Sequence, residues 1–161
     1  MPTGVTIRPV TREDVPVLLR FIRELAEYEK LLHEAVGTEA DLIQYLFGPS
    51  PKVEALLAEA ENVPVGFCLY FHTFSTFLTR HGIYIEDLYI TPDYRGSGVG
   101  GLLLKAVVAI AKQRNCGRVE WAALDWNTPA INFYTKLGAR QMNEWKTFRL
   151  TEDGFDKILD L

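Results

Sequence analysis

The chain has 161 residues, of which 48% are apolar and 24% are charged, and its formal net charge is −4. This length is typical of one soluble globular domain, so we expect residues 1–161 to form a single domain. The acidic balance argues against a nucleic-acid partner, which would require a basic face. The N-terminal residues lack the pattern of a signal peptide, and no apolar run approaches the ~20 residues that span a bilayer, so we expect a cytoplasmic protein without a membrane partner.

The cysteines and histidines show no metal-binding pattern. Cys68 and Cys116 are far apart and form no C-x-x-C motif, and the three histidines lack H-x-x-x-H spacing. We therefore expect two small thiols without a disulfide framework, and no metal site.

The first half of the chain predicts a strand, two helices and a hairpin. Residues 5–10 alternate as a strand does, and Thr11 with Asp14 resembles a capping box that starts a helix ending near residues 28–30. Residues 38–48 predict a second helix. Residues 53–60 are rich in Ala, Glu and Leu and fit a helix by propensity. The turn at residues 61–62 and the apolar run at 65–72 favour a β-hairpin instead.

The second half predicts a strand over 82–90, a helix over 98–115, a strand over 117–124 and a helix over 127–137. The strand–helix–strand unit should be parallel and right-handed. Residues 140–150 predict one or two closing strands, and residues 151–161 a short helical turn. The fold class is therefore α/β, with a mixed sheet and helices on both faces.

Four glycines precede the long helix in the stretch "DYRGSGVGGLLLK", residues 93–105. A bare backbone at a helix N-terminus suits a phosphate group, and Arg95 adds a charged donor. The stretch lacks the Lys-Ser/Thr of a Walker A loop. Residues 96–101 formally match G-x-G-x-x-G, but a dinucleotide loop normally lies in the first strand–helix unit, so we disfavour a nicotinamide cofactor.

The R-x-x-G-x-G pattern at 95–100, after "LYITPDY" and before "DWNTPAINFYTKLGA", resembles the GCN5-related N-acetyltransferase (GNAT) superfamily. "RELAEYEKL", "YIEDLYITPDYRG" and "LDWN" resemble the diamine (spermidine/spermine) and thialysine Nε-acetyltransferases of that superfamily. The resemblance implies acetyl-CoA as co-substrate and a homodimer. It also implies a mostly antiparallel sheet of about six to seven strands, with a splayed parallel pair near 83–90 and 118–124.

The resemblance implies that acetyl-CoA binds along the central strand, the glycine loop and the helix at 127–137. Backbone groups of the strand would hold the pantetheine arm, and loop N–H groups would hold the pyrophosphate. The cofactor-binding residues expected on this basis are Leu88, Tyr89, Ile90, Arg95, Gly96, Ser97, Gly98, Val99, Gly100, Gly101, Asn127, Thr128, Pro129, Ala130 and Tyr134.

Two residues are expected to be catalytic by the same resemblance. Tyr134 would protonate the departing thiolate; without the resemblance, its helical spacing fits a packed aromatic side chain equally well. Glu86 interrupts an apolar strand, where burying a carboxylate without a partner costs free energy. An incoming ammonium group would be such a partner. Asp87 shares this role or serves structurally. Because successive strand residues face opposite sides, only one of these two acids is expected on a given face.

The expected substrate-binding residues are acidic or aromatic: Tyr28, Glu29, Glu86, Asp87, Glu120, Trp121 and Asp125. Tyr28 and Glu29 also fit a solvated helix end, and Asp125 also fits a helix cap. The sequence departs from the diamine branch at Asn143, where that branch carries an acceptor glutamate, and at "LDWN" in place of "AEWN".

The function expected from these residues is acetyl transfer from acetyl-CoA to a primary amine of a small cationic substrate, by direct attack in a ternary complex. The substrate is expected to be a lysine-like amino acid such as thialysine, or a diamine or polyamine. Two alternatives remain open: a protein or peptide N-acetyltransferase, and a non-catalytic acyl-CoA-binding domain.

Overall fold

The computed structural model describes residues 4–161 and contains one five-stranded sheet in the order β1-β2-β3-β4-β5. The chain divides into two compact units, of which the first runs to Ala122 and the second is Ala123–Leu161. The whole sheet and the first three α-helices lie in the first unit. The strands are β1 Val5–Pro9, β2 Glu54–Ala60, β3 Val63–Ser75, β4 Arg80–Ile90 and β5 Val119–Trp121, and the α-helices are α1 Val15–Tyr28, α2 Glu39–Phe47, α3 Val99–Gln113, α4 Thr128–Lys136 and α5 Phe155–Leu159.

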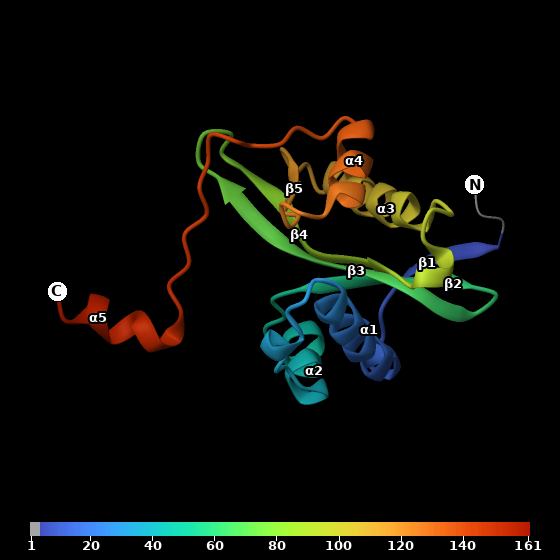
Figure 1. Ribbon diagram of the computed structural model, residues 1–161, viewed down its shortest axis with the longest axis horizontal. Coiled ribbons are helices and arrows are strands. Elements are labelled where there is room, and N and C mark those ends of the chain that lie inside the picture. The colour runs from blue at the N-terminus through green and yellow to red at the C-terminus, as the bar shows by residue number, and fades with distance from the viewer. Residues whose placement is uncertain (1–3) are drawn as a thin grey trace. The chain divides into compact units, whose positions relative to one another are not determined.

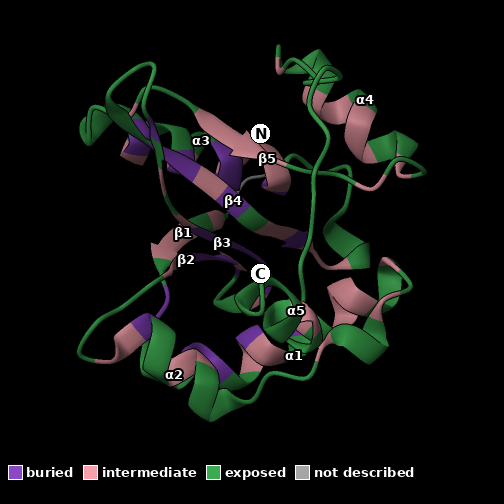
Figure 2. Ribbon diagram, turned by 90° about the vertical axis from the view of Figure 1, so that its left-hand side faces the viewer, coloured by how far each residue is buried: buried purple, intermediate pink, exposed green. Residues whose placement is uncertain are grey.

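Helices cover both faces of the sheet in the first unit (Figure 1). α1 and α2 pack on one face through a cluster that includes Phe21, Phe67 and Tyr89, which we call the α1-side cluster. α3 packs on the other face, in the α3-side cluster, which includes Ile85 and Leu103. The buried residues of these layers lie along the central strands and the helix faces turned toward them (Figure 2). The predicted α/β class with helices on both faces is confirmed.

Residues 53–60 form strand β2, so the hairpin prediction is confirmed. β2 and β3 pair antiparallel, and the turn residues Glu61 and Asn62 both have positive φ, at 50° and 65°. Two left-handed residues are what a tight hairpin turn requires. β2 buries side chains on both faces, and this burial outweighs the helix propensity of its Ala, Glu and Leu residues.

The predicted parallel pair is β4 with β5, and its pairing is short. Ile83 pairs with Val119 and Ile85 with Trp121, where the pairing ends. In the described part of the chain, β4 therefore continues from residue 86 to residue 90 with β3 on one side and no paired strand on the other. The pairing ends where β5 itself ends, at Trp121, because β5 is shorter than the predicted 117–124. The splay that the resemblance implies stays a prediction.

The prediction of closing strands at 140–150 is wrong, and the sheet has five strands, not six to seven. Trp145 and Phe148 lie three residues apart, so a strand could not place both on one face, and both are exposed. The helix predicted at 127–137 is confirmed as α4, and the helical turn at the C-terminus as α5. Gly138 follows α4 with φ 93°, as a C-terminal glycine cap does.

Arg8 joins three elements at the start of the first unit. Its guanidinium donates to both carboxylate oxygens of Asp14, at 2.7 and 2.9 Å, and to both of Glu59, at 3.1 and 2.8 Å. Asp14 also accepts the backbone N–H of Thr11, which confirms the predicted capping contact. These hydrogen bonds lower the pKa of Asp14 to about 2.

Replacing Asp14 with Asn is expected to reduce the free energy of unfolding by about 1 to 2 kcal/mol, because the partly buried hydrogen-bond network of Arg8 loses a charged acceptor. Asp41→Asn is the matched control, because Asp41 closes the same contact with Thr38 at an exposed helix start without an arginine; its loss should be below about 1 kcal/mol. Because the pKa of Asp14 is depressed, its carboxylate stabilises the fold fully above about pH 4, and this contribution is lost as the pH falls to about 2. The difference in free energy of unfolding between the parent chain and Asp14→Asn, measured by denaturant melts, should therefore shrink over that range.

Candidate active site

A β-bulge in β4 places Glu86 and Asp87. Leu69 of β3 pairs with Asp87 and Tyr70 pairs with Ile85, so Glu86 is an extra residue on β4. Ile85 and Leu88 consequently both pack in the α3-side cluster, although they are three residues apart.

The bulge brings both acids to one face of the sheet. By alternation, Glu86 shares the face of Tyr84, and Asp87 shares that of Tyr89, which packs in the α1-side cluster. The expectation that only one of the two acids faces a given side is therefore wrong, because it assumed regular alternation across the bulge.

Three carboxylates gather on this α1-facing side, and the raised pKa values of Asp87 and Glu29 indicate it. Burial, then the charges of Glu86 and Glu29, raise the pKa of Asp87 to about 7. Burial and the charge of Glu86 also raise the pKa of Glu29, which follows the end of α1. We call Glu29, Glu86 and Asp87 the carboxylate cluster.

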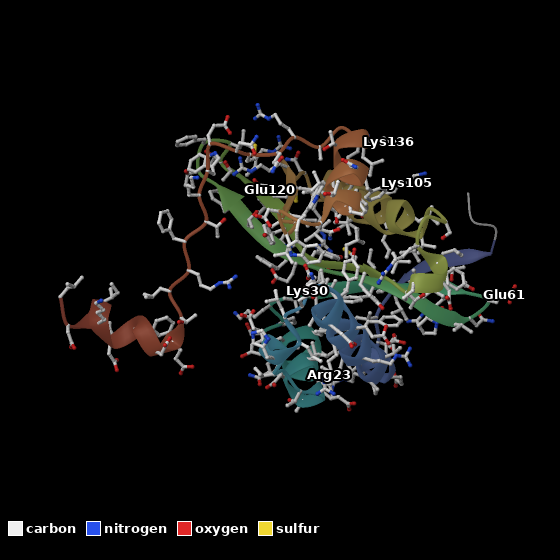
Figure 3. All side chains as sticks on the ribbon, in the orientation of Figure 1. Arg23, Lys30, Glu61, Lys105, Glu120 and Lys136 are labelled. Atoms are coloured by element: carbon white, nitrogen blue, oxygen red, sulfur yellow. The ribbon has the colours of Figure 1, made fainter. Side chains whose placement is uncertain are left out.

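Glu120 lies beside this cluster, whereas Trp121 does not. Glu120, labelled in Figure 3, lies on β5. Its pairing partner on β4 is Tyr84, and the pKa of Tyr84 is raised by burial, then by the charges of Glu86 and Glu120. The Glu120 carboxylate lies 3.1 Å from Nε of Arg118. Trp121 packs in the α3-side cluster, on the opposite face of the sheet.

Arg95 and Tyr28 are in contact. The guanidinium carbon of Arg95 lies 4.7 Å from the ring centre of Tyr28 and 5.6 Å from that of Tyr89. Its Nε donates to the backbone carbonyl of Ile90 at 3.0 Å. Tyr89, expected to act through its backbone, also donates its hydroxyl to Glu24 at 2.6 Å, a contact that the sequence did not indicate.

The glycine loop has the open backbone that the sequence predicted. Gly96 and Gly98 have positive φ, at 73° and 96°, and α3 begins at Val99. A Cβ atom added at Gly96 or Gly101 would meet no atom within 4 Å, so internal packing does not explain these two glycines. The first N–H groups of a helix have no partner inside it, which leaves the amides at the start of α3 available to an anion.

The remaining predicted residues lie in the second unit. The side chain of Asn127 caps α4 by accepting the N–H of Ala130 at 3.5 Å, and Thr128 and Pro129 form the first turn. Tyr134 is half-buried, with its ring centre 5.4 Å from that of Phe133. The functional roles expected of these residues, and of the exposed Asp125, stay predictions.

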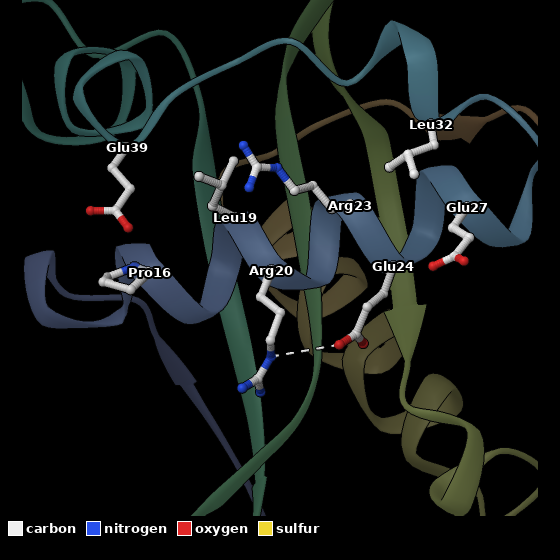
Figure 4. A pocket seen from close by; sticks show the side chains of 8 residues that line it. All are labelled: Pro16, Leu19, Arg20, Arg23, Glu24, Glu27, Leu32 and Glu39. Carbon is white, nitrogen blue, oxygen red and sulfur yellow. Dashed lines mark ion pairs between the residues drawn. The ribbon is translucent and has the colours of Figure 1, made fainter.

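A separate hollow of about 330 Å³ lies on the outer side of α1 (Figure 4). None of the predicted site residues lines it, and its charges are mixed: Nε of Arg20 lies 3.6 Å from the Glu24 carboxylate. Within residues 4–161 there is no group of three or more His, Cys, Asp or Glu side chains that could hold a metal ion. No helix among these residues is long and apolar enough to cross a membrane. The hollow is lined by Pro16, Leu19, Arg20, Arg23, Glu24, Glu27, Leu32 and Glu39.

Comparison with known proteins gives consistent matches. The acetyltransferase (GNAT) family matches residues 19–139. The thialysine N-epsilon-acetyltransferase of Sus scrofa is 40% identical, and the match covers 96% of this chain and 97% of that protein. The L-ornithine N5-acetyltransferase of Arabidopsis thaliana is 34% identical, over 98% of this chain and 90% of the relative.

Solved structures agree in fold. An integron cassette protein from the mobile metagenome of V. cholerae superimposes with a TM-score of 0.81 at 28% identity, covering 99% of this chain and 100% of that one. An aminoglycoside acetyltransferase from an uncultured soil metagenomic sample matches with a TM-score of 0.77 at 18% identity, over 92% and 96% of the two chains.

Proposed function

The chain belongs to the acetyltransferase (GNAT) family and is an amine N-acetyltransferase, and from this premise we propose that it transfers the acetyl group of acetyl-CoA to a primary amine of a small cationic molecule. An acetyltransferase excludes the non-catalytic acyl-CoA-binding alternative. The proposed acceptor is a lysine-like amino acid such as thialysine or ornithine, or a diamine.

The observation that carries this proposal is the carboxylate cluster. Burial, and then repulsion among the carboxylates of Glu29, Glu86 and Asp87, raises the pKa of Asp87 and of Glu29. A bound ammonium group would relieve this repulsion and the cost of burial. The second amino group of a thialysine-like or diamine substrate would also find acidic partners here, and Glu120 lies nearby on β5.

The proposed chemistry is a direct attack. Glu86 binds the ammonium and, together with Asp87, accepts a proton from it, so that the nitrogen lone pair can attack the thioester carbonyl. A C–N bond forms, the C–S bond breaks, and the departing thiolate takes a proton from Tyr134. The second proton that the nitrogen loses on becoming an amide restores the phenol of Tyr134. A backbone N–H of β4 polarises the carbonyl oxygen.

We propose that acetyl-CoA is held by backbone groups. The unpaired edge of β4 over Leu88–Ile90 offers backbone groups to the pantetheine arm, although the Ile90 carbonyl already accepts a hydrogen bond from Nε of Arg95. The side chains of Leu88 and Ile90 pack in the α3-side cluster. The open glycines and the N-terminus of α3 offer N–H groups to the pyrophosphate. Asn127, Thr128, Pro129 and Ala130 complete the proposed contacts.

The test is to incubate the chain with acetyl-CoA and a panel of thialysine, lysine, ornithine, putrescine, spermidine and a lysine-containing peptide, measuring released thiol. We expect turnover with at least one small diamino compound and little with the peptide. Turnover with the peptide alone would support the alternative of a protein or peptide acetyltransferase. Coenzyme A binding without turnover on any small amine would contradict the proposal.

The pH dependence of the reaction is expected to follow Asp87. Its pKa of about 7 means that the carboxyl is mostly neutral below pH 7 and accepts a proton only above it, so kcat/KM for the amine should rise as pH increases through about 7. In Asp87→Asn this inflection should disappear. An unchanged inflection in Asp87→Asn would assign it to another group.

Stability measurements provide a control for the same carboxyl. Because the pKa of Asp87 is raised in the folded chain, the contribution of this carboxyl to the free energy of unfolding falls as the pH rises from about 4 to about 7. Asp87→Asn removes this loss, so the variant should melt several degrees above the parent chain at pH 8. The difference should shrink toward pH 4.5.

Assembly, location and domain organisation remain proposals. We propose a cytoplasmic homodimer in which residues 1–161 form one acetyltransferase domain; the family match, which spans both compact units, supports the single domain. Light scattering on the purified chain should give twice the monomer mass of 18.3 kDa.

A further inference from the structure

Arg95 touches both a fixed and an exposed tyrosine. Tyr89 is fixed, because its hydroxyl donates to Glu24 and its ring lies 5.5 Å from that of Phe21, and it is 4% exposed. Tyr28 is the last residue of α1 and is 41% exposed. The planar guanidinium contacts both rings, so it holds the exposed ring against a buried anchor.

Arg95 and Tyr28 are each followed in the sequence by a residue of the proposed site, and these two residues belong to different parts of it. On one side, Arg95 directly precedes Gly96, the first glycine of the loop. On the other side, Tyr28 directly precedes Glu29, whose pKa is raised by burial and then by the charge of Glu86. One contact therefore joins the proposed anion-binding loop to the carboxylate cluster.

We infer that Arg95 is a positioning residue for the amine: its stacking on Tyr28 holds the end of α1, and with it Glu29, at the carboxylate cluster. This inference rests on the proposed function. The role depends on the flat face of the guanidinium, because a lysine ammonium keeps the positive charge but has no planar group to stack.

The first test separates the substrates kinetically. In Arg95→Lys the charge near the loop remains, so KM for acetyl-CoA should stay within about 2-fold, whereas KM for the amine should rise about 3- to 5-fold, as expected for one exposed cation–π contact. Arg12→Gln is the matched control, because Arg12 also lies over a ring, that of Phe47 at 5.6 Å, and also donates to a backbone carbonyl. It should leave both KM values unchanged.

The second test is a double-mutant cycle with Tyr28. Tyr28→Phe keeps the ring face and should raise KM for the amine less than Tyr28→Leu does, whereas Tyr28→Leu should raise it at least as much as Arg95→Lys. In the double variant with Tyr28→Leu, Arg95→Lys should cause no further increase, because the contact is already lost.

Three results would overturn the inference. In the first, the increases in KM for the amine caused by the two single variants multiply in the double variant. In the second, Arg95→Lys raises only KM for acetyl-CoA. In the third, Tyr28→Phe raises KM for the amine as much as Tyr28→Leu does. A parent chain that acetylates no small amine contradicts the proposed function instead. Melting curves and coenzyme A titrations of each variant identify any that has lost its fold.

Discussion

The Glu86→Gln variant is expected to lose about 100-fold or more in kcat/KM for the amine, within the range for removal of a general base. Gln keeps the shape of the side chain and the bulge but removes the charge that would hold an ammonium group. The loss should appear in both KM for the amine and kcat, because Glu86 is proposed both to bind the ammonium and to help remove its proton. KM for acetyl-CoA should change little.

Glu86→Gln should also shift the pH–rate profile, an effect that a loss of structure would not produce. The charge of Glu86 contributes to the raised pKa of Asp87, so Glu86→Gln should move the inflection of the pH–rate profile from about 7 to a lower pH. Glu61→Gln, at the exposed turn between β2 and β3, is the control and should change neither rate nor profile. A full parent rate in Glu86→Gln would exclude Glu86 from the chemistry.

The Tyr134→Phe variant is expected to lose about 100-fold in kcat while both KM values stay close to those of the parent chain. The phenol is proposed to protonate the thiolate as the tetrahedral intermediate collapses, and phenylalanine keeps the ring but not the proton. Tyr45→Phe, at an exposed position of α2, should leave kcat unchanged.

The leaving group offers a specific check on this role. A thiol of lower pKa leaves with less help, so the defect of Tyr134→Phe should shrink with acyl donors that carry a more acidic thiol. A defect of equal size with every donor would indicate that Tyr134 supports packing with Phe133 and not proton transfer.

Much of the fold is predictable because its signals are local. The capping contact of Thr11 with Asp14, the period of the apolar residues in α1 and α3, and the turn at residues 61–62 each depend on a few neighbouring residues. Residues 140–150 were predicted wrongly for the opposite reason. A strand requires a hydrogen-bonded neighbour, and the residues of a short segment alone do not supply one.

The acidic residues of the candidate site were also predictable, but their arrangement was not. The sequence singles out Glu29, Glu86 and Asp87, yet the bulge arises from the register between β3 and β4, which no pattern within β4 reveals. The stacking of Arg95 on Tyr28 joins residues 67 positions apart, so it too depends on the fold. The acidic side chains indicated that the site could bind a cation, whereas the register between β3 and β4 determined which of these side chains lie together.

The unpaired edge of β4 has a consequence for handling the protein. A strand edge with free backbone groups readily pairs with the edge of another molecule, and charged side chains are a common protection against such pairing. Glu86 and Asp87 stand at the start of this edge, so the two acids proposed to bind the amine would also discourage aggregation. A double Glu86→Gln, Asp87→Asn variant should then precipitate more readily than the parent chain, and coenzyme A in the buffer should keep it in solution.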